Sequence, residues 1–147
     1  MQVFIENEAG SREKRTFDER SLRHLKTAPI SAAYPFPYGF VLGTVSGDGD
    51  AVDCFVLTRR ALRSGTTLIC KPVALLEQVE DGETDHKVIA VPDGEDETVT
   101  AADEAALRAF VAGVFAHVAG KTMVVGRLLG PDAAEDFIRR SRTDAPR

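Results

Sequence analysis

The chain has 147 residues, a formal net charge of -5 and a hydrophobic content of 44%, which predicts one domain spanning residues 1–147. The acidic balance argues against nucleic acid as a partner, because binding to a phosphate backbone needs a basic surface. No apolar run reaches the ~18 residues of a membrane span. The N-terminal residues also lack the basic and apolar regions of a signal peptide, so we expect a cytoplasmic protein without membrane contact.

The first two thirds of the chain predict short β-strands. Residues 3–6 and 14–17 are expected to form two strands that are joined by a turn at residues 8–11. Further short apolar runs follow, separated by turn sequences rich in Gly, Asp and Pro, at residues 40–45, 54–57, 66–70, 73–77 and 87–91. Short strands at such near-regular spacing are typical of a closed barrel or a sandwich.

The last third of the chain has helical periodicity. Apolar residues recur at helical spacing from Leu107 to Val118, with an N-cap at Thr100 and a stop at Gly120. A short strand at residues 122–125 and a second helix opened by Pro131 are expected to follow. Strands first and helices last predict an α+β fold, a small closed β-barrel flanked by two C-terminal helices.

Three aspartates within residues 48–53, sequence DGDAVD, carry the most chemical information. Asp48 and Asp50 fall on one side of an extended chain, and Asp53 begins the apolar run that follows. Carboxylates this close repel one another unless a divalent cation neutralises them, so the cluster predicts a cation site. A solvated turn stays open as an alternative, because Asp and Gly are common in turns. A calcium loop of the EF-hand type is excluded, because Asp53 and Arg59 stand where it needs Gly and Glu.

A rigid aromatic segment, residues 34–40 with the sequence YPFPYGF, precedes the aspartates. Together with DGDAVD, which begins ten residues after Tyr38, it resembles the motifs of the soluble family I inorganic pyrophosphatases. Residues 70–76 (CKPVALL) and 80–92 (EDGETDHKVIAVP) are similar to the next strand and the acidic loop of that family. Residues 5–14 are similar to its first hairpin. The resemblance covers residues 3–92 and implies an OB-like barrel, in agreement with the predicted fold.

This resemblance implies Mg²⁺-dependent hydrolysis of pyrophosphate, or of a related small phosphate, by a metal-activated water in a homo-oligomer. Mn²⁺ or Zn²⁺ are the alternative metals. The resemblance also assigns a role to individual residues, namely Asp50 as the general base, Asp48, Asp53 and Asp85 as metal ligands, Lys14, Lys26, Tyr38 and Lys87 as phosphate-binding residues, and Glu6 and Tyr34 as supporting residues. A further metal ligand is Glu80 in an ungapped match, or Asp81 if the loop has lost one residue. Such a set is suited to phosphoryl transfer, which depends on positioning and charge neutralisation.

Several positions depart from the family pattern. Thr16 stands where the family has a glutamate, and Lys26 where it has an arginine that clamps phosphate. Val118 and Ala119 replace a Tyr-Lys pair that binds phosphate. The expected metal site is therefore nearly complete, whereas the phosphate clamp lacks about three charge-assisted donors. Two alternatives stay open for this reason, a hydrolase for another phosphate ester or anhydride and a non-catalytic metal-binding protein.

Overall fold

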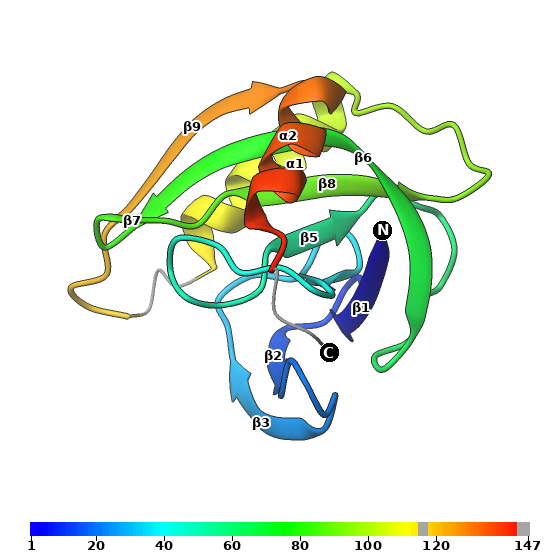
Figure 1. Cartoon of the computed structure of the whole chain (residues 1–147). Coiled ribbons are helices and arrows are strands. Elements are labelled where there is room, and N and C mark those ends of the chain that lie inside the picture. Colours follow the sequence, from blue (N-terminus) through cyan, green and yellow to red (C-terminus); the bar gives the residue numbers. More distant parts are fainter. Residues whose placement is uncertain (115–117, 144–147) are drawn as a thin grey trace.

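The computed structural model describes residues 1–114 and 118–143, and in this part of the chain five strands close into a ring (Figure 1). The ring order is β1 (Gln2–Asn7), β4 (Tyr38–Val41), β5 (Asp53–Val56), β8 (Lys87–Pro92) and β6 (Thr67–Glu80), and β6 pairs back with β1. Neighbours are antiparallel except β5 and β8, which are parallel. Two further strands, β7 (Glu83–Thr84) and β9 (Met123–Leu129), pair with β6 outside the ring. This ring confirms the predicted small OB-like barrel.

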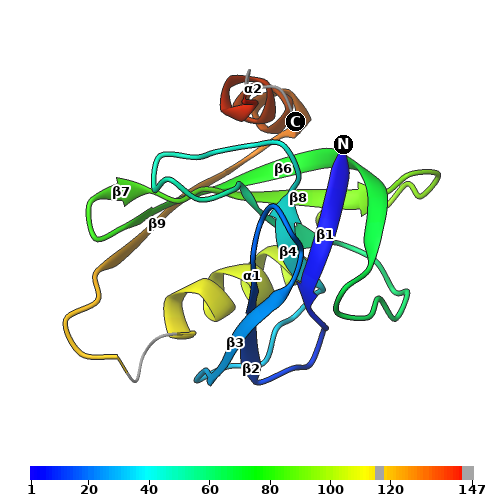
Figure 2. The same ribbon diagram turned by 60° about the horizontal axis from the view of Figure 1, so that its bottom comes forward.

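The two helices, α1 (Ala101–Gly113) and α2 (Pro131–Ser141), lie on different sides of the barrel wall (Figure 2). Strand alternation explains this arrangement, because successive side chains of β5 face opposite ways. Cys54 belongs to the apolar cluster inside the ring, which Phe137 of α2 covers. Phe55 belongs to a second cluster outside the ring, which Phe110 of α1 covers. The α+β prediction with two C-terminal helices is confirmed, and no helix in the described ranges is long and apolar enough to cross a membrane.

Helix α1 starts as predicted but ends earlier. The Thr100 hydroxyl accepts a hydrogen bond from Asp103 N, and the Asp103 carboxylate accepts one from Thr100 N, which completes a capping box. The helix then ends at Gly113 and does not continue to Gly120. Glycine is a poor helix former, and Val118 is 43% exposed, so it does not extend the buried stripe. The predicted stripe also included Phe115, which lies outside the described residues.

The two strands and the turn predicted within residues 3–17 are present, but the two strands do not pair with each other as a hairpin. Strand β2 (Glu13–Phe17) does not pair with β1 but with β3 (His24–Pro29), antiparallel, and the two form a separate sheet that we call the β2–β3 hairpin. The sequence prediction missed β3 because all its residues are exposed, so it lacks the apolar alternation of a half-buried strand. The two strands expected at residues 66–70 and 73–77 are the single strand β6, in which an irregularity near Pro72 accommodates the proline.

The β2–β3 hairpin is attached to the barrel by both polar and apolar contacts. Arg15 N donates to the Asn7 Oδ1 atom at 2.7 Å, and Asn7 Nδ2 donates to the Arg15 carbonyl at 3.2 Å. The ring of Phe17 meets that of Phe4 edge to face, with 5.1 Å between the centroids. Asn7 itself is only 1% exposed, so this end of the hairpin is held firmly against β1.

Candidate active site

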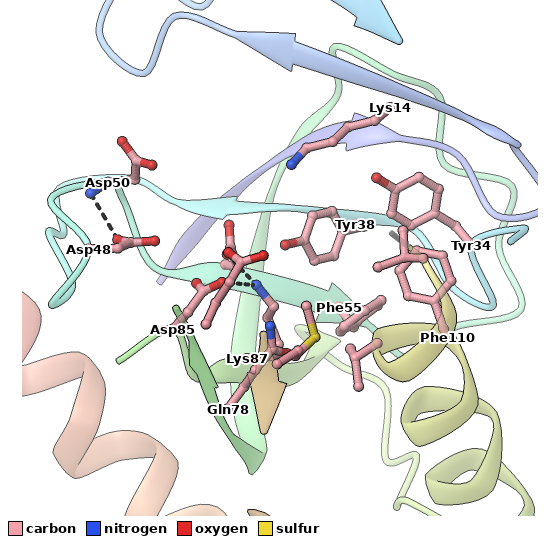
Figure 3. A pocket seen from close by; sticks show the side chains of 15 residues that line it. Lys14, Tyr34, Tyr38, Asp48, Asp50, Phe55, Gln78, Asp85, Lys87 and Phe110 are labelled. Atoms are coloured by element: carbon pink, nitrogen blue, oxygen red, sulfur yellow. Dashed lines mark hydrogen bonds and ion pairs between the residues drawn. The ribbon is translucent and has the colours of Figure 1, made fainter. Parts of the chain in front are cut away.

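One cavity of about 130 Å³ brings together most of the residues that the sequence predicted for the site (Figure 3). The predicted residues that line it are Lys14, Tyr34, Tyr38, Asp48, Asp50, Asp53, Glu80, Asp85 and Lys87. They come from the β2–β3 hairpin, the segment leading into β4, the loop before β5, and the adjoining parts of β5, β6 and β8. The barrel thus gathers on one side residues that are up to 73 positions apart in the sequence, from Lys14 to Lys87.

The loop before β5 holds Asp48 and Asp50 in a tight turn. Gly49 between them has a φ of 86°, in the left-handed region that favours glycine. Asp48 Oδ1 accepts hydrogen bonds from Ser46 Oγ at 2.9 Å and from Asp50 N at 3.0 Å. Ser46 N also donates to the Asp50 carbonyl at 2.7 Å, which closes the turn. Both aspartates line the cavity, so the turn serves to present carboxylates to it.

Lys87 lies between two carboxylates at the base of the cavity. The parallel pairing of β5 with β8 puts Lys87 opposite Asp53 in register. The Lys87 ammonium donates to Asp53 Oδ2 at 2.6 Å and to Asp85 Oδ2 at 3.0 Å. Burial alone would lower the pKa of Lys87, but the two carboxylates outweigh it and hold that pKa above its usual value. Lys87 therefore remains an ammonium ion although it is almost fully buried.

The cavity carries more negative than positive charge. Among the described residues that line it, five are carboxylates and two are lysines. Burial, followed by the charges of Asp48 and Asp53, raises the pKa of Asp50 above its usual value. Burial and the neighbouring Asp53 also raise the pKa of Asp85. Hard oxygens in excess of cations are the ligand set that a divalent cation prefers, so the residues present fit such an ion.

These carboxylates do not yet form a coordination shell. Within the described ranges no three His, Cys, Asp or Glu side chains converge on a common point. The Lys87 ammonium occupies the space between Asp53 and Asp85, and its two ion pairs hold these carboxylates in place. A cation bound between them would therefore compete with Lys87 for the same oxygens.

The opposite wall of the cavity is aromatic. Tyr34 and Tyr38 stack with 5.3 Å between ring centroids, and Phe110 of α1 packs on Tyr34 at 4.6 Å. The Lys87 ammonium lies 5.7 Å from the centroid of the Tyr38 ring. Burial raises the pKa of both phenols above their usual value, so each remains a neutral hydroxyl. Lys14 enters from the β2–β3 hairpin on the other side of Tyr38 from Lys87 (Figure 3).

Three predicted site residues are not among those that line the cavity. Lys26 is exposed on β3. Asp81 lies in the turn between β6 and β7, where its Oδ1 accepts a hydrogen bond from Thr122 N at 2.9 Å. Glu6 is buried in β1, and its Oε2 accepts a hydrogen bond from Phe17 N at 3.0 Å. Burial raises the pKa of Glu6 to about 7. Of the two alternatives in the acidic loop, the cavity receives Glu80.

Sequence reasoning gave no role to three polar residues at or near the cavity. Gln78 lines it and is 2% exposed. Both Glu19 carboxylate oxygens accept a hydrogen bond from Ala51 N, at 3.0 and 3.1 Å, which ties the β2–β3 hairpin to the aspartate loop. Lys121 Nζ lies 3.1 Å from Glu80 Oε1. Gln78 had a signal in the sequence, because it precedes Glu80 by two residues and shares its face of the strand.

The architecture and the cavity together define a class: an OB-like barrel with a site of carboxylates, lysines and phenols suited to divalent cations and phosphate oxygens. The family model described as inorganic pyrophosphatase matches residues 3–143. An inorganic pyrophosphatase of Methanosarcina acetivorans is 31% identical over 96% of this chain and 89% of its own length. This chain therefore belongs to the inorganic pyrophosphatase family.

Other relatives match over shorter stretches or in structure. The inorganic pyrophosphatase of a Nostoc species is 33% identical over 62% of this chain, and the chain spans about half the length of that relative and of several others. The crystal structure of the inorganic pyrophosphatase from Thermus thermophilus has a TM-score of 0.87 at 26% identity and covers 96% of this chain and 88% of its own. The similarity in structure thus extends over nearly the whole chain.

Proposed function

We propose that this protein hydrolyses inorganic pyrophosphate to two phosphate ions in a Mg²⁺-dependent reaction, as a homo-oligomer in the cytoplasm. The observation that carries the proposal is the cavity in which five carboxylates, two lysines and two phenols converge. Membership of the inorganic pyrophosphatase family supports the same conclusion.

In this proposal Asp48, Asp53 and Asp85 hold Mg²⁺, and Glu80 is a further ligand. Glu80 is preferred to Asp81 because it lines the cavity, whereas the Asp81 carboxylate binds the backbone of Thr122. Bound Mg²⁺ would neutralise charge on the phosphate oxygens and activate the attacking water. Mn²⁺ and Zn²⁺ are the metals to compare with it.

Asp50 is the proposed general base. The attacking water forms a bond to one phosphorus atom, the bond from that phosphorus to the bridging oxygen breaks, and the second phosphate leaves. The proton that the water loses passes to Asp50. Asp50 suits this role because its carboxylate lines the cavity, lies next to Asp48 and Asp53 in the aspartate cluster, and is not itself a proposed ligand of the metal.

Lys14, Lys87 and Tyr38 are the proposed contacts to phosphate oxygens. The two lysines approach from opposite sides of Tyr38, so they can hold an anion between them (Figure 3). Tyr34 and Glu6 support these residues, Tyr34 by stacking on Tyr38 and Glu6 by its bond to the β2–β3 hairpin. Lys26 is exposed and outside the lining of the cavity, so we do not give it a phosphate contact.

One observation favours a second candidate function. Apolar side chains line part of the same cavity, namely Phe55, Phe110, Val111, Val114 and Met123. Pyrophosphate has no apolar group to place against this wall, whereas a phosphate ester or anhydride with an organic substituent does. Hydrolysis of such a compound is the alternative.

The test is phosphate release from pyrophosphate and from a panel of nucleotides, measured with and without Mg²⁺, Mn²⁺ and Zn²⁺. We expect Mg²⁺-dependent release from pyrophosphate, most of which Asp50→Asn removes. Release only from nucleotides would favour the second candidate. If no compound is cleaved with any of the three metals, the protein is a non-catalytic member of its family.

A further inference from the structure

A buried amide lies at the inner end of the carboxylate cluster. Leu76, Gln78 and Glu80 point to the same side of β6, because side chains alternate along a strand. Leu76 is fully buried in the apolar cluster beneath α1, and Glu80 lines the cavity. Gln78 between them is 2% exposed and also lines the cavity, as Figure 3 shows. The polar wall of the site therefore begins at Gln78.

The side-chain oxygen of Gln78 has no hydrogen-bond partner among the described residues. Such an unsatisfied buried acceptor costs about 1–3 kcal/mol. The backbone on both sides is fixed, because Gln78 N donates to His86 Nδ1 at 2.9 Å and Asp85 N donates to the Gln78 carbonyl at 2.9 Å. The strand therefore cannot shift to bring the amide to a protein donor.

The charges nearby indicate what the amide oxygen binds. Glu80 and Asp85 line the same cavity and are acceptors in their ion pairs. The two ammonium groups at these carboxylates are already engaged, since Lys87 donates to Asp53 and Asp85 and Lys121 pairs with Glu80 at 3.1 Å. An oxygen in these surroundings is satisfied by a cation or by the water shell of a cation. A phosphate oxygen would be repelled by it. A neutral oxygen also adds a ligand to the cluster without adding to its negative charge.

We infer that Gln78 supplies a neutral oxygen ligand, directly or through a water of the ion, to a divalent cation held by Glu80 and Asp85. This inference rests on the metal requirement of the proposed function. It identifies Gln78 as a determinant of metal affinity that the motifs in the sequence do not contain. Gln78 is placed to complete the shell that the carboxylates alone do not form in the described structure.

The experiment measures Mg²⁺ binding without substrate, as the concentration that gives half-maximal thermal stabilisation of the full chain. Gln78→Met removes the oxygen at similar volume and should raise that concentration about 10–100-fold, the usual effect of losing a residue that supports a metal site. Gln78→Glu keeps an oxygen and should bind Mg²⁺ at least as tightly as the unmodified protein. The control is Gln2→Met, at the chain's other glutamine, which is exposed on β1. This variant should leave the Mg²⁺ concentration for half-maximal stabilisation unchanged.

Each outcome decides the question. An unchanged Mg²⁺ requirement in Gln78→Met overturns the inference, since the amide then serves only the packing of the core. If Gln78→Met does not fold, Gln78→Glu decides, and weaker Mg²⁺ binding by that variant also overturns it. Pyrophosphate hydrolysis by the unmodified protein is measured in parallel. Its absence, combined with the expected Mg²⁺ shifts, would refute the proposed function and leave this inference standing.

Discussion

Replacing Lys87 with methionine tests the centre of the site. The Lys87 ammonium pairs with Asp53 at 2.6 Å and with Asp85 at 3.0 Å, and the side chains of Lys87 and Asp85 are each only 8% exposed. Methionine fills a similar volume but leaves the buried Asp85 and the partly buried Asp53 without their cation. Removing one partner of a buried ion pair lowers the free energy of unfolding by about 3–5 kcal/mol, and we expect a loss of that size without divalent cations.

The matched control is Lys71→Met. Lys71 pairs with Asp96 at 3.2 Å, but the two side chains are 49% and 95% exposed. A surface pair of this kind contributes about 0–1 kcal/mol, so the control should unfold almost like the unmodified protein in urea. A loss in Lys87→Met no larger than in the control would refute the argument that the buried pair holds the carboxylates together.

Two further readouts separate stability from catalysis in this variant. Mg²⁺ should stabilise Lys87→Met more than the unmodified protein, because the cation replaces the lost ammonium between Asp53 and Asp85. Pyrophosphate turnover at saturating Mg²⁺ should still fall on the order of 10²-fold or more, the effect of losing one key electrostatic donor. Full turnover under those conditions would show that Lys87 stabilises the site but does not bind phosphate.

Three other predictions follow from the described contacts. Asp50→Asn should keep Mg²⁺ affinity in a thermal titration but lose most turnover, whereas Asp53→Asn should lose both; equal loss of affinity would contradict the division of roles. Burial raises the pKa of Glu6 from 4.5 to about 7, so in this pH window the folded state binds the proton more tightly and stability falls as pH rises. Glu6→Gln removes this dependence, so at pH 8 in EDTA its free energy of unfolding should exceed that of the unmodified protein by up to about 3 kcal/mol, whereas at pH 4 the two should agree. A difference in the free energy of unfolding that stays the same from pH 4 to pH 8 would rule this out. Gly39→Ala should destabilise by about 3 kcal/mol or more, because the new Cβ would lie 1.7 Å from the Phe4 carbonyl oxygen; a urea midpoint within error of the unmodified protein would disprove the close approach of β1 and β4.

The barrel strands could be predicted from sequence wherever burial imposes a pattern. The runs that became β5 and β8 are apolar on both faces, because one face lies inside the ring and the other lies under α1. Strand β3 has no such pattern, since both its faces are exposed. Strand β2 pairs with β3 because β4 and β6 already occupy both edges of β1. These pairings are long-range contacts, and local periodicity does not predict them.

The residues of the candidate site also fall into those that the sequence predicts and those that only the fold reveals. The aspartates and tyrosines lie in short motifs, so their types and spacing predict their chemistry. Glu19 joins the aspartate loop only because the β2–β3 hairpin folds over it, and Ala51, its partner, lies 32 residues away in the sequence. Gln78 looks like any polar residue of a strand until the fold shows that its oxygen is buried without a partner in the described part of the chain and that its side chain lines the same cavity as the carboxylates. Tertiary contacts that no motif encodes were therefore the part that could not be predicted.

The β2–β3 hairpin has a consequence for how this protein can diverge in evolution. It carries Lys14, one of the proposed phosphate contacts, on a sheet of its own, whereas the barrel sheet carries Asp53 and Lys87. Substitutions at the exposed positions of β3 can accumulate without disturbing the strands that hold the carboxylates. Thr16 and Lys26, two of the positions that depart from the family pattern, face each other across this hairpin. Selection on the bound anion can therefore act on one small surface element while the inherited metal chemistry is preserved.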